Sequence, residues 1–309
     1  MKVLMNDRLR VVIVSAEAAP YTETGRLAEA IGTLPESLSR LGCEVSLVLP
    51  KYRRPAIEAL SLTSVLPRLA VPLGTEMIKT TVFKAEVEVR SLPGIPSAEN
   101  GENGKPFFSV YFIENAKYFG RDRVFGSDNV PYLDNDERFT FFNRATLEFI
   151  SKARLGADIL HCHDWPTALV PLFLRTQYAG KRHFRNTASV LTLHDAAAQG
   201  VFPPESFALT GLNWDFFTPD QLALNGQFNF LKAGLIFADA LSAASAGCAE
   251  AVRSGAAGSG LAAILARRES GATTPCQNFP IISNHPQPAE YLDLYRQAME
   301  SKRGGSHVR

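Results

Sequence analysis

The sequence predicts an α/β fold built around a parallel sheet. A continuous apolar run at residues 9–15 suits a strand buried on both faces, and an amphipathic helical pattern follows at 27–41. Two later apolar runs, 157–164 and 191–200, also read as buried strands and end in polar residues. With 309 residues, 46% of them hydrophobic, the chain is long enough for two domains or for one large α/β domain with an appendage.

The first strand, helix and second strand form a βαβ unit. Apolar residues recur at three- and four-residue spacing along the helix: Leu27, Ile31, Leu34, Leu38 and Leu41. The pattern continues past Pro35, although proline disfavours a helix interior. Gly42 directly follows as a stop signal, and the strand at 43–50 comes next.

The middle of the chain predicts an inserted hairpin and a second long helix. Runs at 80–89 and 107–113 alternate or are apolar, and they flank a polar, Gly-rich loop at 97–105. This arrangement favours a hairpin or a small subsheet. Helical periodicity returns at 136–154.

Polar residues cluster just after three of the expected strands, near 15–26, 161–165 and 194–200. Ligands of open α/β sheets bind outside the carboxyl ends of the strands. We therefore expect these three segments to converge on one cleft.

The C-terminal part predicts shorter elements. A helix is expected around 226–238 and a strand around 240–245, after which the composition shifts to Ala, Gly and Ser. Residues 269–287 contain three prolines and no periodicity, which indicates a linker. One helix is expected at 288–301, and 302–309 are expected to be a disordered tail.

Composition and charge exclude several classes of protein. The formal charge is +1, so no net field favours nucleic acid or an anionic membrane. The sequence shows no signal peptide and no apolar run of about 18 residues, so a cytoplasmic protein is expected. The four cysteines lie far apart without a C-x-x-C pair, which favours free thiols over disulfides or a zinc knuckle.

The strongest candidate residues lie in HCHDW (161–165) and LHDAAAQG (193–200). The first offers two imidazoles, a carboxylate and an indole at a strand end, and the second repeats the His-Asp pair. His-x-His could suggest a metal, but no third ligand has recognisable spacing. Hydrogen bonding to a polar ligand is the favoured interpretation, with no metal and no cofactor.

Weaker candidates have structural alternatives. The turn before the helix at 27–41 contains Gly25, and free N–H groups there could receive a phosphate or a sugar hydroxyl, although a plain turn explains it equally well. Asp134 could cap the helix at 136–154 instead of binding a ligand. Trp214 suits a core position better than a sugar platform, and Lys232 is expected to snorkel or pair with an acid. The remaining acids beside Asp134 are expected to form a solvated face: Asp136 and Glu137.

Five motifs, in this order, resemble the glycogen and starch synthases: SAEAAPY…TG-x-LAEA, YLDN-xx-RF-xFF-x-RA, HCHDW, LTLH…QG-x-FPPE and NFLKAG…AD. The resemblance covers about residues 9–268. It implies a GT-B glycosyltransferase, in which two Rossmann-like domains face a cleft. Glucose passes from ADP-glucose, or sometimes UDP-glucose, to the end of an α-1,4-glucan, with retention and without metal.

The resemblance implies that residues 1–268 are the acceptor-side, N-terminal half of such an enzyme: a Rossmann-like parallel sheet with helices on both faces. The helix at 288–301 resembles the family helix that crosses back onto this half. The resemblance implies that Asp134, His163 and Asp164 line the cleft; the remaining glucan-binding candidates are Trp165, His194 and Gln199. The Gly25 turn is implied to approach the donor phosphates.

Departures from the family pattern bear on activity. The family turn reads K-T-G-G-L, whereas this chain has Glu23, Thr24, Gly25 and Arg26 before Leu27. A carboxylate thus replaces the lysine that meets the donor phosphates, which reverses an attraction. Likewise, the family's H-N-L-A-Y-Q-G is here His194 to Gly200 with an acid, Asp195, in place of the amide.

The family's nucleotide-binding C-terminal domain has no counterpart in these 309 residues. We therefore expect a degenerate, synthase-like protein that binds glucan or maltooligosaccharide, or that pairs with a full-length synthase or another glycogen enzyme. A glucosyltransferase that a partner chain completes and that uses ADP-glucose is the alternative, as is a remnant without carbohydrate function. No catalytic residue is assigned.

Overall fold

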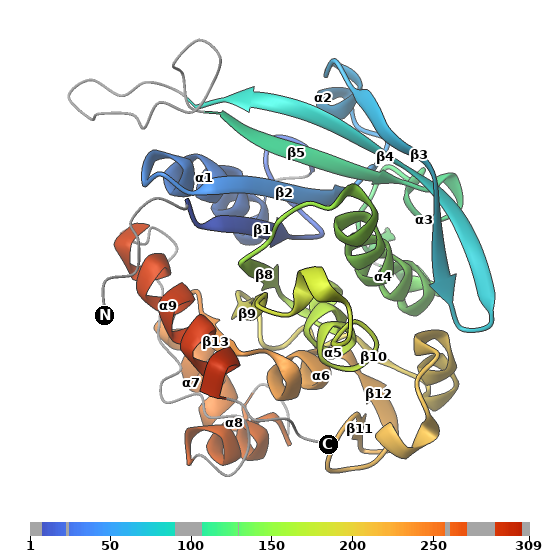
Figure 1. The fold of residues 1–309 in the computed structure, drawn as a ribbon. Helices are drawn as coiled ribbons and strands as arrows, with labels where there is room; N and C mark the ends of the chain where they lie inside the picture. Colours follow the sequence, from blue (N-terminus) through green and yellow to red (C-terminus); the bar gives the residue numbers. More distant parts are fainter. Residues whose placement is uncertain are drawn as a thin grey trace.

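The computed structural model describes residues 8–22, 25–89, 107–128, 130–256, 260–270 and 288–304. They form a central eight-stranded sheet with helices on both faces (Figure 1). In spatial order its strands are β13 (Ala240–Ala243), β9 (Ala188–Leu193), β8 (Ile159–His163), β1 (Arg10–Val14), β2 (Glu44–Pro50), β5 (Phe107–Glu114), β4 (Glu76–Glu88) and β3 (Thr63–Leu73). Neighbours from β13 to β5 pair in parallel, whereas β4 and β3 are antiparallel. The predicted α/β fold is confirmed.

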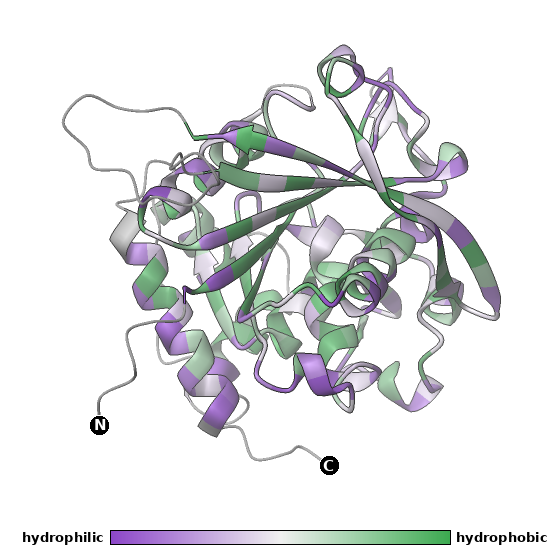
Figure 2. Cartoon of the chain, turned by 45° about the horizontal axis from the view of Figure 1, so that its top comes forward, coloured by the Kyte–Doolittle hydropathy of each residue, from purple (hydrophilic) through white to green (hydrophobic). Residues whose placement is uncertain are grey.

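The sheet separates two hydrophobic cores because successive residues of a buried strand point to opposite faces. Val12 and Val14 of β1 belong to the core that contains α4 (Asn135–Ala153), α5 (Leu169–Thr176), α6 (Phe230–Phe237) and α8 (Leu261–Glu269). Val11 and Ile13 belong to the core on the other face, beneath α1 (Arg26–Arg40) and α9 (Pro288–Gly304). Figure 2 shows the central strands as mostly hydrophobic.

The inserted hairpin is confirmed and is larger than predicted. Strand β4 pairs with β5 as expected, and β3, which no sequence pattern indicated, pairs with the outer side of β4. Strand β3 lies against α4. This cover explains why α4 is buried around most of its circumference, including Phe139, Phe141 and Phe142.

The helix expected at 226–238 begins only at Phe230. Residues Gln227–Asn229 instead form β12, which pairs with β10 (Val201–Phe202) and β11 (Ala223–Leu224) in a small sheet. The side chain of Asn229 accepts a hydrogen bond from the N–H of Lys232 and so caps α6. A strong helix cap therefore fixed the start later than the apolar periodicity suggested.

The remaining α-helices and β-strands are short. They are α2 (Pro55–Glu58), α3 (Ala116–Phe119), β6 (Gly126–Ser127), β7 (Val130–Pro131) and α7 (Ala246–Arg253). Helix α7 and helix α8 lie in the Ala-, Gly- and Ser-rich segment, where Ser245 caps α7 by accepting from the N–H of Cys248. Within the described ranges, no helix is both long and apolar enough to span a membrane.

The C-terminal helix exists and is three residues longer than predicted, since α9 continues to Gly304. The expected linker begins with Glu269, which is the last residue of α8, and residues 271–287 of it lie outside the described residues. Residues 305–309 of the expected tail also lie outside them. Three of the cysteines are buried free thiols, as predicted: Cys43, Cys162 and Cys248. Cys276 also lies outside the described residues.

Candidate functional site

Strands β8 and β9 bring the predicted polar residues together at their carboxyl ends. His163 closes β8 and pairs in register with Thr192, so that His194 follows β9 directly beside it. The Nδ1 of His163 lies 3.1 Å from the Nε2 of His194. Strand β1 is the other parallel neighbour of β8. The three strand ends predicted to converge therefore lie side by side.

Asp164 is buried and held in a strained backbone conformation. Its φ of 58° and ψ of −177° lie in a region that residues other than glycine rarely adopt. Its Oδ1 accepts the backbone N–H groups of His194 at 2.7 Å and Asp195 at 3.3 Å. Burial raises the pKa of Asp164 to about 7, although these two hydrogen bonds oppose the rise. The carboxylate thus ties the ends of β8 and β9 together.

The two imidazoles are neutral and incompletely hydrogen-bonded. Burial lowers the pKa of His194 to about 4 and holds that of His163 well below its usual value. A single proton must lie between the facing nitrogens, so one of the two outer nitrogens carries a hydrogen and the other a lone pair. These outer atoms, Nε2 of His163 and Nδ1 of His194, are buried without a hydrogen-bond partner in the part of the chain that the structure describes. The pair can therefore offer a ligand one donor and one acceptor.

Trp165 belongs to the core on the α4 face of the sheet and does not present an open face. It is only 9% exposed and packs against Phe139, with ring centroids 4.9 Å apart. A Cβ at Gly200, where φ is +63°, would lie 2.3 Å from the indole ring. The close approach of the loop after β9 therefore requires glycine at this position.

Asp134 and Gln199 are engaged by other side chains. Asp134 precedes α4 but makes no side-chain cap; instead it forms a bidentate pair with Arg121, whose nitrogens lie 2.8 and 2.5 Å from its oxygens. Partial burial raises the pKa of Asp134, but the bonds and charge of Arg121 outweigh it and hold the pKa below its usual value. Gln199 accepts a 2.8 Å hydrogen bond from Asn229. Neither contact brings these residues to the histidine pair.

The turn before α1 is described only in part. Gly25 has an extended φ of −170°, and a Cβ there would meet nothing within 4 Å. Arg26 begins the helix and is exposed. Glu23 and Thr24 lie outside the described residues. Neither space nor conformation requires glycine at 25, so the donor-phosphate assignment of this turn stays a prediction.

Several structural expectations were wrong. Lys232 is 2% exposed, and its amine donates to the carbonyl oxygens of Pro219 and Ala223 instead of snorkelling or pairing with an acid. Trp214 is 53% exposed, not in the core. The expected solvated acids are bonded: Asp136 accepts from Ser206, and Glu137 accepts from Tyr118 and Lys117.

His161 was placed at the site as part of HCHDW but not among the glucan-binding candidates, and Tyr295 was not predicted as a neighbour of the site. The Nδ1 of His161 lies 2.9 Å from the hydroxyl of Tyr295, and its ring centroid lies 4.1 Å from that of His163. The spacing of two residues on one strand was a usable signal, because it places both imidazoles on the same face of β8. Among the described residues, no group of three His, Cys, Asp or Glu side chains is arranged to hold a metal ion.

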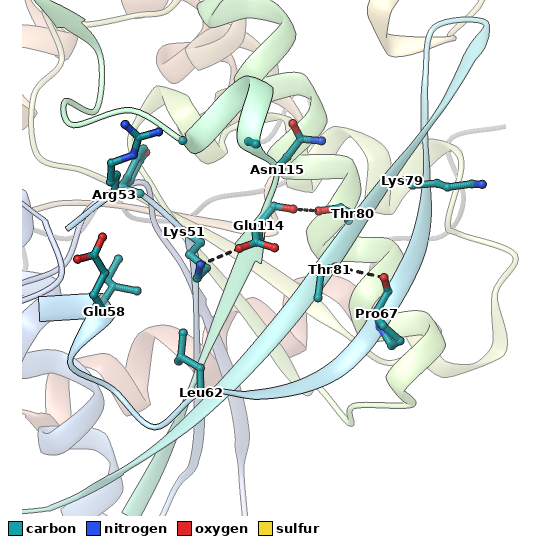
Figure 3. A pocket seen from close by; sticks show the side chains of 14 residues that line it. Lys51, Arg53, Glu58, Leu62, Pro67, Lys79, Thr80, Thr81, Glu114 and Asn115 are labelled. Atoms are coloured by element: carbon teal, nitrogen blue, oxygen red, sulfur yellow. Dashed lines mark hydrogen bonds and ion pairs between the residues drawn. The ribbon is translucent and has the colours of Figure 1, made fainter. Parts of the chain in front are cut away.

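A separate cavity of about 660 Å³ opens at the carboxyl ends of β2 and β5. Figure 3 shows Lys51 paired with Glu114 across it, and Arg53 and Glu58 at one side. The Lys51–Glu114 distance is 2.7 Å. None of the histidine-site residues lines this cavity.

Comparison with known proteins identifies relatives along most of the chain. The family model described as "Starch synthase catalytic domain" matches residues 10–267. The chain is 36% identical to a glycogen synthase of Thermodesulfovibrio yellowstonii over 84% of its own length and 52% of that protein. It is 35% identical to glycogen synthase 2 of Geobacter sulfurreducens, covering 84% and 50%.

A solved structure shows the same architecture. The catalytic domain of starch synthase IV from Arabidopsis thaliana, bound to ADP and acarbose, superposes with a TM-score of 0.72 at 25% identity. The similarity covers 90% of this chain and 52% of that one. The chain therefore spans about half the length of the relatives that it matches.

Proposed function

Because this chain belongs to the family of starch synthase catalytic domains, we propose that it binds an α-1,4-glucan at the carboxyl ends of β8 and β9. In this proposal it does not transfer glucose by itself. It serves as a glucan-binding or regulatory relative of the synthases, in association with a full-length synthase or another enzyme of glycogen.

The observation that supports glucan binding most directly is the pair of unpartnered imidazole nitrogens, on His163 and His194. A buried polar atom without a partner costs about 1–3 kcal/mol, so a ligand that satisfies it is favoured. A sugar hydroxyl both donates and accepts. Two neighbouring hydroxyls match one imidazole donor and one imidazole acceptor, and Asp164 holds both strand ends in place.

Two features support the absence of transfer. The segment between α8 and α9, residues 270–287, is far shorter than a domain of about 50 residues or more, so it does not hold the family's second half. Stabilisation of a charged transition state requires preorganised groups on both sides of the reacting atoms. In addition, Glu23 replaces the lysine that the family uses near the donor phosphates.

The test is calorimetric titration of the chain with maltoheptaose and, separately, with ADP-glucose, followed by a glucose-transfer assay on the same sample. We expect maltoheptaose to bind, ADP-glucose not to bind, and no transfer. His163→Ala should abolish maltoheptaose binding, whereas His183→Ala, which removes an exposed imidazole elsewhere, should leave it unchanged.

Other outcomes would replace the proposal. ADP-glucose binding with transfer would indicate a transferase whose cleft another chain completes. No binding of either ligand would favour a remnant that acts through protein contacts alone. The double variant Glu23→Lys with Arg26→Gly should not create turnover; turnover would show that the donor can bind without the family's second half.

A further inference from the structure

Helix α9 packs directly beneath the candidate site, on the face of the sheet opposite α4 (Figure 1). Four of its side chains enter the core there, each at most 5% exposed: Tyr291, Leu294, Tyr295 and Ala298. They share that core with Ile159 of β8 and Val190 of β9. The helix thus contacts the two strands that carry the site.

Both nitrogens of His161 are hydrogen-bonded, and one bond comes from this helix. Tyr295 Oη lies 2.9 Å from Nδ1, and Thr192 Oγ1 lies 2.7 Å from Nε2. All three side chains are buried. The imidazole of His161 therefore cannot rotate without breaking two buried hydrogen bonds.

His161 is in turn packed against the site. Its ring and that of His163 are inclined by 39° with centroids 4.1 Å apart, and His163 lies 3.1 Å from His194. A continuous set of contacts therefore runs from Tyr295, through His161, to the two unpartnered nitrogens. The packing and polar functions of α9 are separable, because the ring of Tyr295 fills the core and its hydroxyl makes the bond.

We propose that Tyr295 is a positioning residue for the histidine site, and that docking of α9 and occupancy of the site stabilise each other. The hydroxyl of Tyr295 fixes the ring of His161, which holds the ring of His163 in the orientation that leaves Nε2 without a protein partner. When α9 is displaced, His161 loses one of its two bonds and the pair His163–His194 loses its support. Only the choice of maltoheptaose as a probe rests on the proposed function.

The chain contains a matched pair of variants. Tyr295→Phe removes the hydroxyl that bonds His161 and keeps the ring. Tyr291→Phe removes the hydroxyl of the tyrosine one turn earlier on the same buried face. The ring of Tyr291 lies 5.5 Å from that of His161, but its hydroxyl makes no hydrogen bond among the described residues. Thermal melting establishes that each variant folds.

The first readout is the nitrogen-15 spectrum of the histidine rings, which reports protonation and hydrogen bonding at each ring nitrogen. In Tyr295→Phe we expect the resonances of His161, His163 and His194 all to shift, and in Tyr291→Phe none to shift. Unchanged resonances of His163 and His194 in Tyr295→Phe would overturn the proposal. If Tyr295→Phe does not fold, Thr192→Val breaks the other bond of His161, together with that of Thr192 to Ser242, and tests whether the orientation of His161 sets that of His163.

The second readout is binding. Maltoheptaose affinity should decrease at least about fivefold in Tyr295→Phe, because coupled sites typically change each other's affinity by about fivefold or more. It should not change in Tyr291→Phe. By reciprocity, maltoheptaose should slow amide exchange in α9 of the unmodified chain. Equal affinity in the two variants would overturn the coupling. If the unmodified chain binds no maltoheptaose, the proposed function fails, and the ring spectra still decide the role of Tyr295.

Discussion

Two regions at the carboxyl edge of the same sheet differ in how their polar atoms are satisfied. The cavity beside β2 and β5 has volume, and its central polar groups are paired, Lys51 with Glu114 and Thr80 with the carbonyl of Glu114, although the buried hydroxyl of Tyr52 in its lining has no partner among the described residues. The ends of β8 and β9 carry two buried nitrogens without partners and a strained, buried aspartate.

The difference shows that the volume of a cavity and the presence of buried groups that a ligand would satisfy are separate properties. An ion pair with a quarter or more of each side chain exposed, like Lys51–Glu114, contributes at most about 1 kcal/mol and needs nothing further. An orphaned buried nitrogen costs more than that, and a strained backbone adds to the cost. Such features persist where function requires them, which is why the histidine site, and not the cavity, carries the proposal.

The pH dependence of the free energy of unfolding should distinguish the two regions most strongly. The pKa of His161 falls to about 3 and that of His194 to about 4 on burial, and that of His163 is also lowered. Between these values and the ordinary 6.5, the unfolded chain binds protons that the folded chain does not, so stability falls as the pH falls. Asp164, with a pKa of about 7, acts in the opposite direction between about pH 7 and 4, because its folded form binds the proton.

Three histidines outweigh one carboxyl, so the free energy of unfolding should fall on the order of 2 kcal/mol per pH unit below 6.5. Asp164→Asn removes the opposing contribution and should make the fall steeper, whereas Thr80→Val at the cavity, which removes no titratable group, should leave the slope unchanged. Urea denaturation at a series of pH values measures all three. A flat profile for the unmodified chain would show that the histidines are solvated.

Ligand binding should respond to the site and not to the cavity. His194→Ala removes one of the two unpartnered nitrogens and the partner of His163, so maltoheptaose affinity should fall on the order of 100-fold, or about 2.7 kcal/mol. Lys51→Ala, which opens the cavity and breaks its ion pair, should leave that affinity unchanged. Calorimetric titration of both variants decides the matter, and the reverse pattern would move the glucan site to the cavity.

Backbone strain at Asp164 predicts an unusual order of stability. Both Asp164→Ala and Asp164→Gly lose the bonds to the N–H groups of His194 and Asp195, but only glycine relieves the φ of 58°. The glycine variant should therefore be the more stable one by about 1–3 kcal/mol, although glycine ordinarily costs more conformational entropy than alanine. Equal midpoints in urea would indicate that the strand end relaxes when the carboxylate is lost.

Sequence reasoning predicted that His163 and His194 lie together because its signals were local. Polar residues directly after apolar runs placed His163 and His194 at strand ends, and the parallel topology brought those ends together. The sequence pattern could not predict contacts between residues far apart in the chain. Tyr295 is 134 positions from His161, and only the folded sheet brings α9 beneath β8. Lys232 was misjudged for a different reason: its amine donates to the backbone carbonyls of Pro219 and Ala223, and a backbone acceptor leaves no signal in the side-chain pattern.

The smallest effect concerns Asp134, where the sequence left a helix cap and a glucan ligand as alternatives and the structure shows a third role. Its carboxylate bonds Arg121, and both side chains are at least 25% exposed. Asp134→Asn should therefore cost less than about 1 kcal/mol of stability, because water screens the pair. Arg121→Gln should cost more, because Arg121 also donates to the carbonyl of Lys117 and lies over the ring of Tyr132. The double variant should cost less than the sum, because the two residues share one contact. If Asp134→Asn instead weakens maltoheptaose binding while Arg121→Gln does not, the carboxylate exchanges Arg121 for a sugar hydroxyl, and the glucan site extends from β8 and β9 to the start of α4.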